Sequence, residues 1–138
     1  MSPFFFAMLS VKQNLGKRER IKSKIEVDLL FREGQSFFCF PFKLVYLLKD
    51  IGSEQSRTKL LVSIPKRKFK KAVDRNLIRR RIKEAYRQSK NELELPDKGK
   101  ELLLSFIYAH DEIRDFNELQ KRLALSLHKL NVHLESHK

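Results

Sequence analysis

Residues 102–108, Leu-Leu-Leu-Ser-Phe-Ile-Tyr, constrain the fold more than any other part of the sequence. All but Ser105 are apolar or aromatic, so the run shows no alternation between a buried and an exposed face. A strand of this kind must be covered on both faces by other parts of the chain. We therefore predict a strand that is buried on both sides, in a fold where helices pack against a sheet.

The segment before this strand begins with a helix and continues as a hairpin. Ser23-Lys-Ile-Glu26 has the S-x-x-E spacing of a capping box, which predicts the start of a helix. Gly34 is suited to a left-handed C-terminal cap. Period-two aromatic and aliphatic residues then predict two strand pieces within 38–48, interrupted at Pro41.

A further strand is expected over 58–64, and two more helices follow. The first covers 74–90 with Asp74 as its N-cap, and the second covers 115–130. The second helix carries one apolar stripe that we assign to core packing: Phe116, Leu119, Leu123, Leu127 and Leu130. The order helix, strands, helix, strand, helix predicts an α+β sandwich around one strand–helix–strand unit.

The length of 138 residues predicts one folded domain, which we place at 17–132. Residues 1–16 are expected to be a disordered N-terminal extension, and 133–138 a frayed tail. No apolar run reaches the roughly 18 residues of a membrane span. The single Cys39 excludes an intramolecular disulfide, so we predict a cytoplasmic location.

Positive charge is concentrated in one short segment. The chain carries 30 Lys and Arg against 17 Asp and Glu, a net charge of +13. Residues 66–90 hold twelve of the Lys and Arg and two of the acids, so 12 − 2 gives +10 within this segment. Such an excess predicts a polyanionic partner, because binding to phosphates releases condensed counterions.

Helical projection divides this segment into two faces. Ile78, Ile82 and Ala85 fall within an arc of about 60°, which must pack on the sheet. An adjoining arc of about 100° holds Arg79, Lys83, Asn76, Arg87 and Arg80. Like charges stacked at i,i+4 destabilise a helix, so we interpret this cationic face as an RNA-binding surface.

One motif joins the cationic face to its flanks. After Phe69-x-x-Ala72-Val73 the sequence reads Arg75-Asn76-Leu-Ile-Arg79-Arg80-Arg-Ile-Lys83-Glu84-Ala-Tyr86-Arg87. This string closely resembles the signature of the protein subunit of bacterial ribonuclease P. The resemblance extends over residues 17–130 and includes Leu30-Phe31-Arg-Glu-Gly34 and Val62-Ser63 with Lys66-Arg67.

The resemblance implies a fold and an activity. The expected fold is a two-layer α+β sandwich with a mixed four-stranded sheet, about three helices and a left-handed βαβ crossover, like that of some ribosomal RNA-binding proteins. The expected function is to assist removal of the 5′ leader from precursor tRNA, as a protein subunit that is monomeric within the ribonucleoprotein. Catalysis and its Mg²⁺ would belong to the RNA subunit.

The resemblance also implies two sets of site residues. The catalytic RNA would contact Lys66, Arg67, Arg75, Asn76, Arg79, Arg80, Lys83 and Arg87. The precursor-tRNA leader would lie in a cleft between the sheet and the first helix, against Phe31, Lys43 and Val45.

Three positions depart from the family pattern. Leu77 stands where a third Arg is common, and one residue is inserted around Pro65. Val45 occupies a position that is often aromatic, and Tyr46 should point to the opposite face of the strand.

Two other functions compete with this interpretation. A ribosomal or ribosome-assembly protein could use the same basic helix on ribosomal RNA. A metal nuclease could use Asp111, Glu112 and Asp115, although capping of the next helix explains these acids more simply. His133 and His137 have i,i+4 spacing without an evident third ligand, so we predict no metal site and no catalytic side chain.

Overall fold

The computed structural model describes residues 20–52, 55–95 and 99–135. Its helices are α2 (Lys24–Glu33), α3 (Ala72–Ser89), the short 3-10 helix η2 (Lys90–Glu92) and α4 (Phe116–Glu135). Its strands are β1 (Gln35–Cys39), β2 (Phe42–Asp50), β3 (Arg57–Ser63) and β4 (Lys100–Tyr108). The predicted order of helices and strands is confirmed.

The strands form one mixed sheet in the order β1-β2-β4-β3. β2 pairs antiparallel with β1 and β4, while β3 pairs parallel with β4. The apolar run 102–108 therefore lies in an interior strand, as its composition required. α3 joins the adjacent parallel strands β3 and β4, which is the predicted strand–helix–strand unit. The left-handed sense of that crossover stays an implication of the resemblance.

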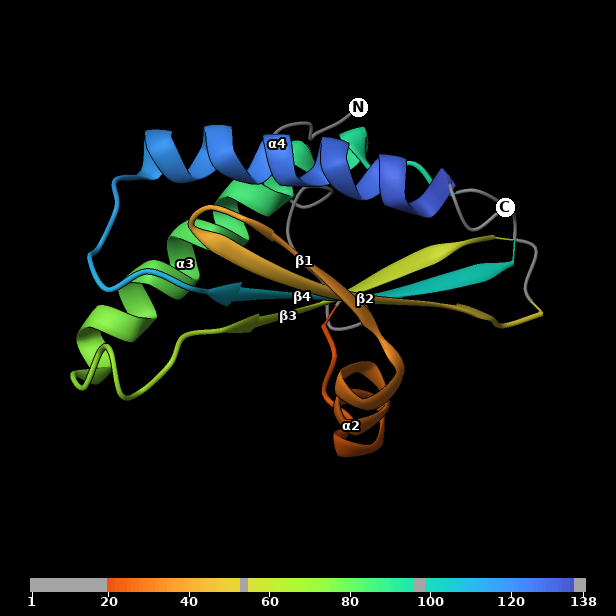
Figure 1. The fold of residues 1–138 in the computed structure, drawn as a ribbon, viewed down its shortest axis with the longest axis horizontal. Helices are drawn as coiled ribbons and strands as arrows, with labels where there is room; N and C mark the ends of the chain where they lie inside the picture. The colour runs from red at the N-terminus through yellow and green to blue at the C-terminus, as the bar shows by residue number, and fades with distance from the viewer. Residues whose placement is uncertain (1–19, 53–54, 96–98, 136–138) are drawn as a thin grey trace, which may run out of the picture.

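Helices cover the two faces of the sheet unequally. Figure 1 shows α3 and α4 on one face and α2 crossing the other. The first face carries the larger core, in which Ile78 and Ile82 of α3 and Leu127 of α4 are fully buried. The second carries a small cluster of Ile21, Leu30, Val45 and Leu103, with four partly buried neighbours. The α+β fold is confirmed, and α2 adds partial cover to the second face.

The ends of α2 and α3 agree with the predictions in one place and differ in two. Ser23 caps α2 by accepting a hydrogen bond from Glu26 N, as predicted. Gly34 is not left-handed, since its φ of −73° and ψ of 161° are extended. Glycine is needed there for space, because a Cβ would lie 2.3 Å from Leu30 O and 2.9 Å from Tyr46 O. Asp74 lies inside the first turn of α3, and Lys71 is the N-cap.

α4 also extends beyond its predicted end. His133–Glu135 are helical rather than frayed, because Leu134 continues the buried stripe and the His133 ring stacks on Phe37 at 4.4 Å. The rest of the predicted tail, 136–138, lies outside the described residues, as does the predicted extension 1–16. No helix within the described ranges is long and apolar enough to cross a membrane.

Candidate RNA-binding surfaces

The cationic face of α3 is held in place by the opposite face of the same helix. Ile78, Ile82 and Ala85 are fully buried, as the projection predicted. Asn76 and Arg80 are exposed, and Arg79, Lys83 and Arg87 are half-buried. We call the predicted contacts for the catalytic RNA the α3 surface. Its members are Lys66, Arg67, Arg75, Asn76, Arg79, Arg80, Lys83 and Arg87.

The connector between β3 and α3, residues 65–71, presents further cations from a fixed turn. Its Phe69 is buried, and Phe69 N donates to Pro65 O at 3.2 Å. The Arg75 guanidinium donates from Nη1 to Phe69 O at 2.8 Å and to Lys70 O at 2.9 Å. Lys66 and Arg67 are exposed on this turn. Arg75 therefore orients the connector, which leaves less of its guanidinium for RNA than the sequence suggested.

Arg87 and Arg79 are also engaged within the protein. Arg87 forms an ion pair with Glu84, which also accepts from Gln88 Nε2 at 2.8 Å. The hydrogen bond from Arg87 lowers the pKa of Glu84, so this carboxylate stays charged at neutral pH. Arg79 Nη1 donates to Asn76 Oδ1 at 3.0 Å. Glu84 thus offsets the charge at the C-terminal end of the α3 surface, and the net positive charge lies toward the connector.

Arg20 lies beside the α3 surface, although it was not among the site residues predicted from the sequence. Arg20 bridges to Leu60 at the outer edge of β3, and Ile21 N donates to Leu60 O at 3.0 Å. Burial, together with the charges of Arg20 and Arg79, lowers the pKa of Lys83. These three cations therefore repel one another, which an anionic partner would relieve. Only the tertiary pairing with β3 reveals this neighbour.

The second predicted set lies on the α2 face of the sheet. Phe31, in the last turn of α2, is 46% exposed, and Lys43 on β2 is exposed. Val45 does not face an open surface, because it is only 6% exposed and packs with Leu30 and Leu103 beneath α2. The predicted contact of Val45 with the leader therefore has no exposed side chain to support it, because α2 covers this residue. Tyr46 points to the opposite face, as predicted, and joins the larger core.

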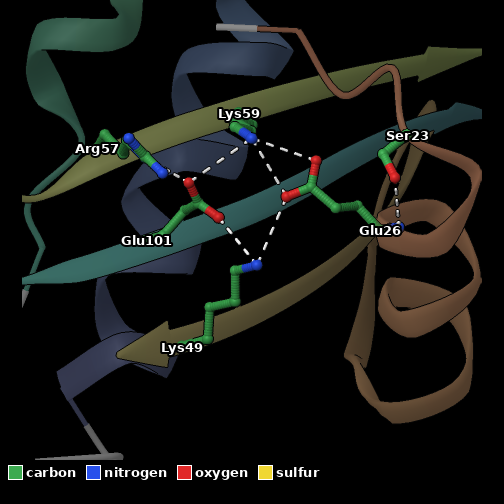
Figure 2. Close-up of polar contacts among 6 residues, drawn as sticks. All are labelled: Ser23, Glu26, Lys49, Arg57, Lys59 and Glu101. Atoms are coloured by element: carbon green, nitrogen blue, oxygen red, sulfur yellow. Dashed lines mark hydrogen bonds and ion pairs between the residues drawn. The ribbon is translucent and has the colours of Figure 1, made fainter. Parts of the chain in front are cut away.

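A charge network that no local sequence pattern displays joins α2 to this face. Glu101 is 1% exposed at the start of β4. It pairs with Arg57 of β3, with Lys49 of β2 at 3.1 Å and with Lys59 of β3 at 3.8 Å. Figure 2 shows Glu26 reaching from α2 to the same two lysines, with Oε1 3.2 Å from Lys59 Nζ and Oε2 3.5 Å from Lys49 Nζ.

This network determines the charge state of its members. Burial opposes ionisation of Glu101, but hydrogen bonds from Arg57 and Lys49 and the charge of Lys59 prevail and lower its pKa. Burial also opposes the charge of Lys49, yet Glu101 and Glu26 raise its pKa. Both groups are therefore charged at neutral pH. The network fixes the start of α2 relative to the sheet and so positions Phe31 at the other end of that helix.

The acids and histidines considered for metal binding have other contacts. Asp115 Oδ1 accepts from Glu118 N at 2.8 Å and caps α4, as predicted. Asp111 and Glu112 flank His110 at 3.8 and 3.5 Å. Within the described ranges no three His, Cys, Asp or Glu side chains are grouped as metal ligands would be. His137 lies outside those ranges.

Comparison with known proteins gives a consistent result. A family model described as Ribonuclease P matches residues 15–131. The chain is 34% identical over 117 residues to a protein of Porphyromonas gingivalis called ribonuclease P protein component, covering 82% of this chain and 83% of that one. A protein of the same name from Listeria monocytogenes is 36% identical over 116 residues, covering 84% and 88%.

Solved structures of similar fold carry related titles. The RNase P protein from Thermotoga maritima matches with a TM-score of 0.57 at 27% identity, covering 81% of this chain and 97% of that one. The RNase P protein of Staphylococcus aureus matches with a TM-score of 0.60 at 20% identity, covering 81% and 94%.

Proposed function

This chain belongs to the bacterial ribonuclease P protein family, and from that premise we propose how its two surfaces serve the holoenzyme. As a family member it is a subunit of an endoribonuclease that processes the 5′ ends of tRNA, and it associates with the ribonuclease P RNA. The α3 surface binds that catalytic RNA, and the sheet face beside α2 binds the 5′ leader of precursor tRNA. The protein acts in the cytoplasm as one copy in each ribonucleoprotein.

One observation carries the assignment of the α3 surface. The apolar side of α3 is fully buried, so its cations are held on a rigid element and lose little conformational freedom on binding. Lys66, Arg67 and Arg80 are exposed, and Lys83 lies near both Arg20 and Arg79. Each phosphate contact would release counterions, which supports binding that weakens steeply as salt is added.

The leader assignment depends on chemistry rather than on charge alone. Phe31 offers an exposed aromatic ring on which an unpaired base can stack, and Lys43 offers a cation for its phosphate. Mature tRNA lacks the leader. Contacts at this face would therefore favour substrate over product.

We assign catalysis and Mg²⁺ to the RNA subunit. Three acids of this chain have structural contacts: Glu101 and Glu26 neutralise lysines, and Asp115 caps α4. The protein contributes by neutralising phosphates, so that the RNA subunit and its substrate can approach closely.

The proposal is tested with a holoenzyme reconstituted from this protein and a bacterial catalytic RNA. At low Mg²⁺ the protein should increase both cleavage and binding of precursor tRNA, and no gain in either would refute the proposal. Replacing Arg79, Arg80 and Lys83 by Ala should weaken binding to the catalytic RNA. The slope of log affinity against log salt should fall by roughly one unit per lost phosphate contact.

A matched variant separates this effect from net charge. Lys24 on α2 and Lys121 and Lys129 on α4 are exposed, so their replacement by Ala removes the same charge from other elements. We expect a much smaller change in the salt slope for this control. Equal slopes for the two triple variants would show that the α3 surface is merely solvated.

A separate measurement tests whether the sheet face beside α2 binds the leader. Phe31→Ala should reduce discrimination between precursor and mature tRNA while binding to the catalytic RNA is retained. Equal loss of affinity for both tRNAs would contradict the assignment. Circular dichroism of the variant checks that the half-exposed ring is not required for folding.

A further inference from the structure

We propose that Phe38 on β1 is a second stacking position for an unpaired base of the substrate, immediately beside Lys43. This inference rests on the proposed function, in which the sheet face beside α2 receives single-stranded RNA. Neither the sequence motif nor the predicted site contained Phe38.

The register of the sheet places Phe38 on that face. Phe38 is the direct partner of Lys43 in the antiparallel pair of β1 and β2. Directly opposite residues project from the same face, and so do residues two apart on one strand. Since Val45 packs against α2, Lys43 and Phe38 lie on the α2 face, one step beyond the part that the helix covers. The Phe38 ring is 58% exposed, whereas Val45 is buried.

The same row of residues continues across the sheet to the basic connector. Lys43 pairs with Ile107 of β4, and Ile107 pairs with Ser63 of β3. Ser63 is the last residue of β3, and the connector with Lys66 and Arg67 follows it. Four strands at the usual spacing make this row about 14 Å wide. An extended chain along it would meet an aromatic ring, a lysine and then the connector cations.

Electrostatics favours RNA as the occupant of this row. Among the described strand residues on the α2 face, Glu101 is the only acid, and it is paired with three cations. Glu101 lies six residues before Ile107 on β4, or roughly 20 Å away along the strand. The row itself carries Lys43 without an acid. A large exposed ring beside an unopposed cation suits a base and its phosphate.

The first experiment exploits the absence of tryptophan from the sequence. Phe38→Trp keeps an aromatic ring and makes the chain's one indole a reporter of stacking. In the reconstituted holoenzyme, its fluorescence should be quenched by precursor tRNA and not by mature tRNA. Val132→Trp is the matched control, because Val132 is 67% exposed on α4, over the other face. Its emission should not depend on the leader, and equal leader dependence at both positions would overturn the proposal.

The second experiment separates an aromatic contact from a structural role. Phe38→Ala should reduce the preference for precursor over mature tRNA by roughly tenfold, and Phe38→Tyr should retain it. If Phe31→Ala loses discrimination while Phe38→Ala keeps it, this inference fails and the proposed function stands. If the unmodified protein shows no leader dependence, the proposed function itself fails. A dimer of the free protein that Phe38→Ala dissociates would also overturn the inference, because a second copy would then cover the ring.

Discussion

Replacing Glu101 by Gln tests whether the buried charge network stabilises the fold. The change keeps the size of the side chain and removes its charge. Arg57, Lys49 and Lys59 then lose the Glu101 carboxylate, while Lys49 and Lys59 keep their pairs with Glu26. Breaking a buried ion pair from one side costs about 3–5 kcal/mol. The three cations are partly exposed and can recover water, so we expect a loss of about 2–3 kcal/mol in the free energy of unfolding at pH 7.

The pH dependence of this loss follows from the lowered pKa of Glu101. A carboxylate whose folded pKa lies below its unfolded value contributes stability above the unfolded pKa, and that contribution is lost as pH falls through the folded pKa. For Glu the unfolded value is about 4.3, so the full contribution is present above about pH 5.5. The difference between the original protein and Glu101→Gln should therefore be constant from pH 6 to 7 and shrink below about pH 4.

Urea denaturation followed by circular dichroism at several pH values measures this difference. Glu33→Gln is the matched control, because Glu33 pairs with Arg32 at 3.4 Å and their side chains are 57% and 68% exposed. That substitution should change stability by less than about 0.5 kcal/mol. If Glu101→Gln is as stable as the original protein at pH 7, or if its deficit is the same at pH 3.5, the Glu101 charge does not stabilise the fold.

Three further substitutions test the packing that holds the two surfaces. Gly34→Ala should lower stability by about 1–3 kcal/mol, because the new Cβ would overlap Leu30 O; a denaturation midpoint that does not fall would contradict this. Arg75→Ala removes the hydrogen bonds to Phe69 O and Lys70 O, so amide hydrogen exchange in the connector should accelerate. Unchanged protection of these amides would argue against a role of Arg75 in orienting the connector. Leu127→Ala, at a fully buried site, should cost about 2–5 kcal/mol in thermal or urea unfolding, and a loss below 1 kcal/mol would count against close packing there.

Local periodicity in the sequence was enough to predict the helices and strands and the cationic side of α3. Ser23 marks the start of α2, the apolar arc with Ile78 marks the buried side of α3, and the stripe with Leu127 marks that of α4. These features depend on residues three or four positions apart, so a linear sequence displays them directly. The cationic side of α3 was predicted for the same reason.

Predictions that depended on how distant segments pack were less successful than those that depended on residue spacing along the chain. Gly34 was correctly expected at the end of α2, but for the wrong reason, since it makes room for the backbone of β2. Val45 was expected to contact the leader in a cleft between the sheet and the first helix, yet α2 packs over it and leaves it buried. Neither the approach of a neighbouring backbone nor the path of a covering helix is encoded in a local pattern.

Only the tertiary structure showed which distant residues meet. Glu101 lies 52 residues from Lys49 along the chain, and Arg20 reaches the surface of α3 through the edge of β3. Phe38 became a candidate contact only when strand register placed it beside Lys43 on the open part of the sheet. The sequence determined that this chain has a sheet-packed cationic helix and belongs with RNA-binding proteins. Folding decided which charges are neutralised inside the protein and which remain for RNA, because ion pairing depends on distances in space.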